Sequence, residues 1–260
     1  MNAKMKVLSL ALVGMFGYVG GAIAACPAGP TTAEGGAWTA KFVSGGSSSM
    51  SIATPGLDGS ECKLRVSLGN NGGAQAQVMD DTPANEPHYR AQFLFDAGAL
   101  TGANGGSQAV IFQTNAPAVH GGLLQAVKIT FSGSGGGSTT SGKRIVIRTA
   151  CESGALSLCG SAPITLPNQT GVNRIEFDLV FGASGTGALR YWVTDGAASG
   201  GSDGSPSGTI TVNGGNAGWT GVDKAYMGLT APTAVFRSLN ADTNAFFDRF
   251  DSRRQTFIGG

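Results

Sequence analysis

The chain has 260 residues, with 17 basic and 16 acidic side chains, and charged residues make up only 13% of it. A chain so weakly and evenly charged has no electrostatic footprint for nucleic acid or for an anionic membrane surface. The chain contains 43 glycines, and glycine-rich segments separate its short apolar runs. This composition is typical of a folded chain with many turns and not of a disordered one.

Residues 1–24 predict a secretory signal peptide. Lys4 and Lys6 form a short positive region, an apolar stretch follows, and the small residues at 22–24 precede a cleavage point. The stretch is interrupted by glycines and has no basic stop-transfer flank, which argues against a membrane anchor. Cleavage leaves 15 basic and 16 acidic side chains. We expect residues 25–260 to form a single β-sandwich domain that is exported to the periplasm, the outer surface or the medium.

The chain contains an even number of cysteines, which in an exported protein predicts disulfides. The preferred pairs are Cys26 with Cys62, and Cys151 with Cys159. An alternative is that "IAAC", which ends at Cys26, is a bacterial lipobox and that this cysteine is acylated. Cys62 would then have no partner.

Short apolar runs with a period of two follow the signal peptide along the chain, and clusters of Gly, Ser and Asn separate them. We find no segment of 12 or more residues with helical apolar spacing after the signal peptide. The pattern predicts an all-β fold, with two packed antiparallel sheets that each bury one face. The predicted strands include 63–68, 89–95, 126–131, 143–148, 173–181, 189–194 and 209–212.

The turn at 80–90, "DDTPANEPHYR", gathers three carboxylates. Asp80, Asp81 and Glu86 supply the hard oxygen ligands that calcium prefers. The segment lacks the regular acidic spacing of known calcium loops, so a solvated turn is the alternative. Calcium is the one cofactor that the sequence suggests.

The strand at 173–181, "NRIEFDLVF", carries two carboxylates on the face opposite its apolar residues. It resembles the E-x-D-x-x-E strand of laminarinase-like glycoside hydrolases, whose first Glu is the nucleophile and whose last is the acid/base. Glu176 and Asp178 match the first two positions, but Phe181 occupies the third and cannot donate a proton. We therefore interpret the pair as a solvated or ligand-binding groove face and predict no catalytic residue.

Two tryptophans lie outside the apolar pattern. Trp192 is on the strand face opposite Tyr191, and Trp219 is in the Gly-rich segment "GNAGWTG". Exposed aromatic rings in such places stack on sugars. The alternative is that neighbouring loops bury both rings.

Three stretches together resemble secreted proteobacterial proteins of the concanavalin A-like, laminin-G-like type. They are "ECKLRVSL" (61–68), "VMDDTPANEPHYRAQFLFDAGAL" (78–100) and "FFDRFDSRRQTFIG" (246–259). The resemblance implies a jelly-roll sandwich in an exported protein. It implies no settled activity and hints at binding to glycans or surfaces.

The sequence therefore favours an exported, non-catalytic module that binds an extracellular glycan or cell-surface polymer. Trp192, Trp219, Glu176 and Asp178 are its candidate ligand-binding residues. One alternative is a glycoside hydrolase or polysaccharide lyase with an atypical site. Another is a structural component of the envelope or of an extracellular matrix.

Overall fold

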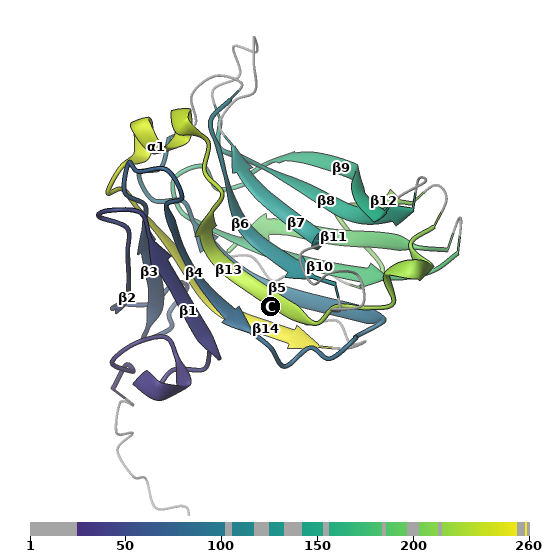
Figure 1. Cartoon of the computed structure of the whole chain (residues 1–260), viewed down its shortest axis with the longest axis horizontal. Helices are drawn as coiled ribbons and strands as arrows, with labels where there is room; N and C mark the ends of the chain where they lie inside the picture. The colour runs from purple at the N-terminus through teal and green to yellow at the C-terminus, as the bar shows by residue number, and fades with distance from the viewer. Residues whose placement is uncertain are drawn as a thin grey trace, which may run out of the picture.

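The protein is a β-sandwich of two antiparallel seven-stranded sheets packed face to face, as Figure 1 shows for the computed structural model. This is the all-β fold of two packed sheets that the alternating apolar runs predict, and the jelly-roll sandwich that the resemblance implies. The structure describes residues 25–101, 106–116, 125–132, 142–152, 156–183, 186–196, 203–212, 215–253 and 258.

The first sheet contains, in spatial order, β1 (Ala40–Ser44), β4 (Gln75–Asp80), β13 (Lys224–Thr230), β6 (Gln108–Asn115), β7 (Gln125–Ser132), β8 (Arg144–Glu152) and β9 (Leu156–Thr165). The second sheet contains β12 (Gly208–Thr211), β11 (Ala188–Asp195), β10 (Val172–Val180), β5 (His88–Asp96), β14 (Asn244–Arg253), β3 (Lys63–Ser67) and β2 (Ser49–Ala53). The remaining elements are the short turns η1 (Thr32–Glu34) and η3 (Ala217–Trp219) and the helix α1 (Ala234–Asn240).

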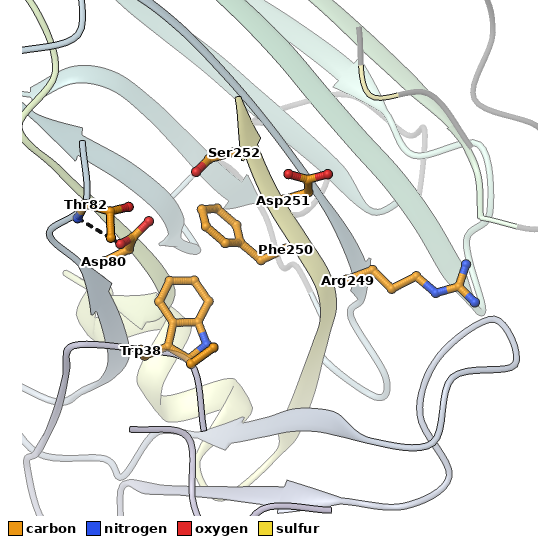
Figure 2. Close-up of a pocket in the computed structure, with 8 residues that line it drawn as sticks. Trp38, Asp80, Thr82, Arg249, Phe250, Asp251 and Ser252 are labelled. Carbon is orange, nitrogen blue, oxygen red and sulfur yellow. Dashed lines mark hydrogen bonds between the residues drawn. The ribbon is translucent and has the colours of Figure 1, made fainter. Parts of the chain in front are cut away.

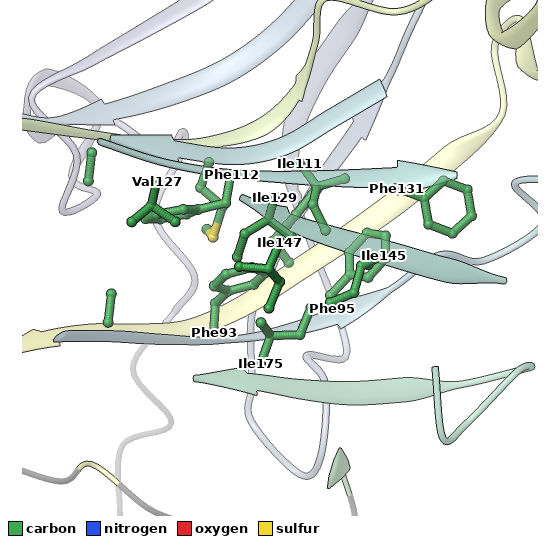
Figure 3. Close-up of a cluster of buried hydrophobic side chains, with 14 of the residues drawn as sticks. Phe93, Phe95, Ile111, Phe112, Val127, Ile129, Phe131, Ile145, Ile147 and Ile175 are labelled. Atoms are coloured by element: carbon green, nitrogen blue, oxygen red, sulfur yellow. The ribbon is translucent and has the colours of Figure 1, made fainter. Parts of the chain in front are cut away.

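The core lies between the two sheets, where their inner faces meet (Figure 3). Phe93 and Phe95 on β5 and Ile175 on β10 point toward Phe112 on β6 and Ile129 on β7. Each of these side chains is almost completely buried. Burying one such side chain contributes about 1.5–3 kcal/mol, so strict alternation in strands from both sheets accounts for the sandwich.

A disulfide between Cys26 and Cys62 attaches the N-terminal segment to the residue just before β3, as predicted. The bond uses the thiol that the lipoprotein alternative would acylate. Cys151 is also disulfide-bonded, and the side chain of its predicted partner, Cys159, lies outside the described residues. Disulfides indicate an oxidising compartment. Among the described residues, no helix is long and apolar enough to span a bilayer.

Candidate functional site

The outward face of the second sheet carries a layer of charged and polar side chains, here called the covered face. Its members are His88, Arg90, Gln92, Arg174, Glu176, Asp178, Arg190 and Trp192. Strand register brings them together, because Glu176 pairs with Gln92 on β5 and with Trp192 on β11. Asp178 lies in the same way between Arg90 and Arg190.

Ion pairs satisfy the carboxylates of the covered face. Arg90 Nε lies 2.8 Å from Glu176 Oε1, and Arg190 Nη2 lies 2.6 Å from Asp178 Oδ2. His88 Nε2 is 2.5 Å from the other oxygen of Asp178. The prediction of a solvated face is therefore wrong for this pair, because Glu176 and Asp178 are 1% and 0% exposed. Carboxylates buried so deeply are stable only when cations and donors compensate them.

Residues from two other parts of the chain lie over this layer. Asp203, which precedes β12, accepts a hydrogen bond from Arg90 Nη2 at 2.9 Å. The backbone N–H of Ile258 donates to Glu176 Oε1 at 3.0 Å. The covered face is thus occupied by the protein's own groups.

The two predicted stacking tryptophans are both buried, as the alternative proposed. Trp192 does lie opposite Tyr191, but its ring is 2% exposed and lies under the guanidinium groups of Arg90, at 4.6 Å, and Arg190, at 5.4 Å. Trp219 is in the core, where its indole N–H donates to the Cys151 carbonyl. In this conformation neither ring presents a surface on which a sugar could stack.

The three residues of the predicted calcium site do not come together. Asp80 accepts a hydrogen bond from the Thr82 N–H, and Asp81 is exposed. Glu86 is buried, and its backbone pairs with Val222. Across the described part of the chain, no group of three or more His, Cys, Asp or Glu side chains could hold a metal ion. The arrangement of these three residues therefore gives no support to a calcium site, and calcium binding stays a prediction.

The outward face of the first sheet has a different composition, and we call it the basic face. Among the outward residues whose side chains the structure describes on β4, β13, β6, β7 and β8, none is an aspartate or a glutamate. Its members on β4, β13, β6, β7 and β8 are Gln75, Gln77, Met79, Lys224, Tyr226, Gly228, Thr230, Gln108, Val110, Gln113, Asn115, Gln125, Lys128, Thr130, Ser132, Arg144, Val146 and Arg148.

Four of these residues form a row across four neighbouring strands. Tyr226 pairs with Gln113, Gln113 with Lys128, and Lys128 with Arg148. Because neighbouring strands lie about 4.8 Å apart, the row is about 14 Å long. A phenol, an amide and two cations are thus available along one line on the sheet.

The cations of this row face each other without a carboxylate between them. Like charges directly opposite on a sheet are destabilising. Burial, and then the Arg148 guanidinium, lower the pKa of Lys128. Among the described residues, neither side chain has an acidic partner, and both line a small cavity of about 70 Å³ together with Thr130. An oxyanion placed here would relieve the repulsion and supply the missing acceptors.

The uncharged residues of the basic face have hydrogen-bonding groups suited to a polar ligand. Gln113 Oε1 accepts from Gln125 Nε2 at 2.5 Å. Burial raises the pKa of Tyr226, so its phenol is protonated at neutral pH and can donate.

The sequence carried part of the signal for this face. Alternation turns Lys128, Arg144 and Arg148 away from the core, and no acidic residue occurs within the predicted strands 126–131 and 143–148. What the sequence did not contain was the pairing order. Tyr226 lies 113 positions beyond Gln113, and only the register of β13 beside β6 makes them neighbours.

A search of protein-family models finds no match, and neither does a search of curated proteins. Solved structures share the fold. An endo-β-1,4-glucuronan lyase from the fungus Trichoderma reesei superposes with a TM-score of 0.60 at 10% identity, covering 88% of this chain and 94% of that one. A PL-14 alginate lyase from Aplysia kurodai gives 0.51 at 12% identity, covering 80% and 87%. At such identities the likeness establishes the β-sandwich fold alone.

Proposed function

We propose that this protein is an exported module that binds an acidic polysaccharide along the basic face. The observation that carries the proposal is the row from Tyr226 to Arg148, in which two cations stand opposite each other in a face that lacks carboxylates among its described residues. Carboxylate or sulfate groups of a polymer match these cations. The side-chain amide of Gln113, which is only partly buried, matches its hydroxyl groups.

The covered face is a poorer candidate for this ligand. Its two paired guanidinium groups, from Arg90 and Arg190, face three carboxylates, from Glu176, Asp178 and Asp203. The third arginine of this face, Arg174, lies 3.8 Å from the carboxylate of Asp58, so these cations are already compensated by the protein's own carboxylates. Reaching them would also require breaking buried ion pairs.

The names of the two similar folds guide the choice of probe. One is a glucuronan lyase and the other an alginate lyase, and both names refer to acidic polysaccharides. Oligosaccharides of glucuronan and alginate are therefore the first ligands to test, with neutral cello-oligosaccharides of equal length as comparison.

The test is a calorimetric titration of the wild type and of a Lys128→Gln/Arg148→Gln variant with these oligosaccharides. We expect the acidic oligosaccharides to bind the wild type. Removing the two cations should weaken binding at least 10-fold, because each charge-assisted hydrogen bond contributes roughly 1.5–3 kcal/mol and 1.4 kcal/mol is tenfold in affinity.

Arg65→Gln provides the matched control. Arg65 is an exposed arginine on β3 of the other sheet, where it donates to Ser51, so its removal changes the net charge without touching the basic face. We expect this variant to bind as the wild type does. Equal loss in Arg65→Gln and in the double variant would contradict the proposal, as would equal binding of neutral and acidic oligosaccharides.

A second function, β-elimination of a uronate polymer, is favoured by the adjacency of Tyr226, Gln113 and Lys128. In that reaction a base removes the proton next to the uronate carboxyl group, a C=C bond forms, and the glycosidic C–O bond breaks as its oxygen takes up a proton. The lowered pKa of Lys128 suits the base, and the raised pKa of Tyr226 suits the proton donor.

Ultraviolet absorbance distinguishes catalysis from binding alone, since elimination creates a conjugated unsaturated uronate. An enzyme would generate this product, and Tyr226→Phe would suppress it while oligosaccharide binding is retained. If the wild type binds the polymer and no product forms, the protein is a binding module only.

A further inference from the structure

A second concave site lies where the strand β14 meets the segment before β1 and the end of β4. It is a cavity of about 470 Å³, within the size range of small-molecule sites, and we call it the Trp38 pocket. Its lining residues are Ala37, Trp38, Asp80, Thr82, Arg249, Phe250, Asp251 and Ser252. No residue of the basic face lines it.

The side chains of the Trp38 pocket are divided by β14, as Figure 2 shows. Trp38 and Phe250 lie next to each other on one side of the strand, with their ring centroids 4.7 Å apart. Asp80 and Thr82 are on the same side, whereas the Arg249 side chain extends in the other direction. An aromatic pair and a carboxylate therefore share one wall.

A β-bulge places Phe250 in this wall. The register of β14 against β5 shifts between Asp248 and Asp251, and Arg249 has a φ of 47°, in the left-handed region that non-glycine residues rarely adopt. The Arg249 side chain is held by Asp58, through its carboxylate at 3.2 Å and its carbonyl at 2.6 Å. Bulges and such strained residues are frequent at binding sites because they redirect side chains.

The polar groups of the pocket are suited to hydroxyl groups. Asp80 accepts one hydrogen bond from the Thr82 N–H, and in the described structure it has no basic partner. Arg249, the basic residue in the lining, is already paired with Asp58. The hydroxyls of Thr82 and Ser252 complete the polar wall.

We propose that the Trp38 pocket binds an uncharged sugar ring. The Trp38–Phe250 pair would cover the C–H face of the ring, while the Asp80 carboxylate would accept hydrogen bonds from its hydroxyls. Asp80 repels carboxylates, so this pocket takes a different class of sugar from the basic face. The two sites would allow one protein to contact both neutral and acidic units.

The test uses saturation-transfer NMR on the full chain with cellobiose, maltose, lactose and glucuronic acid as probes. We expect at least one neutral disaccharide to give a signal and glucuronic acid to give a weaker one. Trp38→Ala should reduce the affinity for the neutral sugar at least 10-fold. Asp80→Asn, which preserves the size of the side chain, should reduce it several-fold.

Two further variants make the outcome specific. Leu239→Ala removes an exposed apolar side chain on α1, away from the pocket, and should bind as the wild type does. Lys128→Gln/Arg148→Gln should also keep the neutral-sugar signal, because neither residue lines the Trp38 pocket. The test of the Trp38 pocket is therefore independent of the test of the basic face. The proposal is overturned if no neutral disaccharide binds, if Trp38→Ala and Asp80→Asn both bind normally, or if glucuronic acid binds as well as the neutral sugars.

Discussion

Arg90 shows how single residues decide which face of this sandwich can bind a ligand. Its guanidinium is 1% exposed and contacts Glu176, Asp203 and the ring of Trp192. A cation so deeply buried needs each of these partners. The covered face is therefore a structural layer, and the sequence motif Glu176–Asp178 belongs to it.

Replacing Arg90 with Met should destabilise the protein strongly. The carboxylate of Glu176 would remain buried without its main cation, a situation that costs roughly 3–5 kcal/mol. Urea denaturation checks this, with Arg65→Met on the exposed surface as the control. A loss below about 1 kcal/mol would mean that the Arg90–Glu176 pair does not hold this layer together.

We expect Lys128 to make the proposed binding of an acidic ligand dependent on pH. Burial and Arg148 depress its pKa below the ordinary 10.5, and a bound oxyanion would raise that pKa again because it favours the charged form. The affinity for the acidic ligand is therefore highest at pH values below the pKa that Lys128 has in the free protein. It declines as the pH rises through that pKa.

Titrations from neutral to alkaline pH check this dependence. Lys128→Arg provides the comparison, because arginine stays protonated throughout the range. We expect the wild type to lose affinity before the Arg variant does. Identical pH profiles would show that Lys128 does not contact the anion.

At the scale of elements, Gly228 controls how β13 lies beside β4. Its φ of 138° is open mainly to glycine, and a Cβ at this position would lie 2.3 Å from the carbonyl oxygen of Ala76. A β-bulge begins just before it, between Met227 and Thr230. The close approach of these two strands positions Tyr226 on the basic face.

We expect Gly228→Ala to destabilise the fold by roughly 1–3 kcal/mol, the cost of a strained backbone conformation, and to weaken acidic-ligand binding by moving β13. Gly72→Ala is the matched control, since a Cβ there has no atom within 4 Å. Unfolding curves and titrations measure both effects. Equal stability of the two variants would contradict the steric argument.

The strands themselves were largely predictable, because one buried face forces apolar residues to alternate. The inward set Phe93, Phe95, Ile129 and Ile175 follows directly from that period. The bulge at Arg249 was not predictable, since it depends on contacts with Asp58, which lies 191 positions earlier in the chain.

At the scale of the whole molecule, the sandwich has two outward faces with different electrostatic character. Charge is balanced over the chain as a whole. The strand order places the buried ion pairs on the second sheet. It places Lys128 and Arg148, which have no acidic partner among the described residues, on the first sheet. Sequence reasoning therefore predicted the fold, whereas the glycan ligand is a proposal that binding experiments must test. It selected Glu176, Asp178, Trp192 and Trp219, whose burial depends on packing that no local pattern encodes.

The most direct measurement is to map amide chemical-shift changes as a glucuronan or alginate oligosaccharide is added to the isotope-labelled protein. We expect changes centred on β13, β6, β7 and β8, around Tyr226, Gln113, Lys128 and Arg148. Changes centred instead on β5, β10 and β11, or no changes at all at concentrations that saturate binding, would contradict the assignment of the basic face as the binding site.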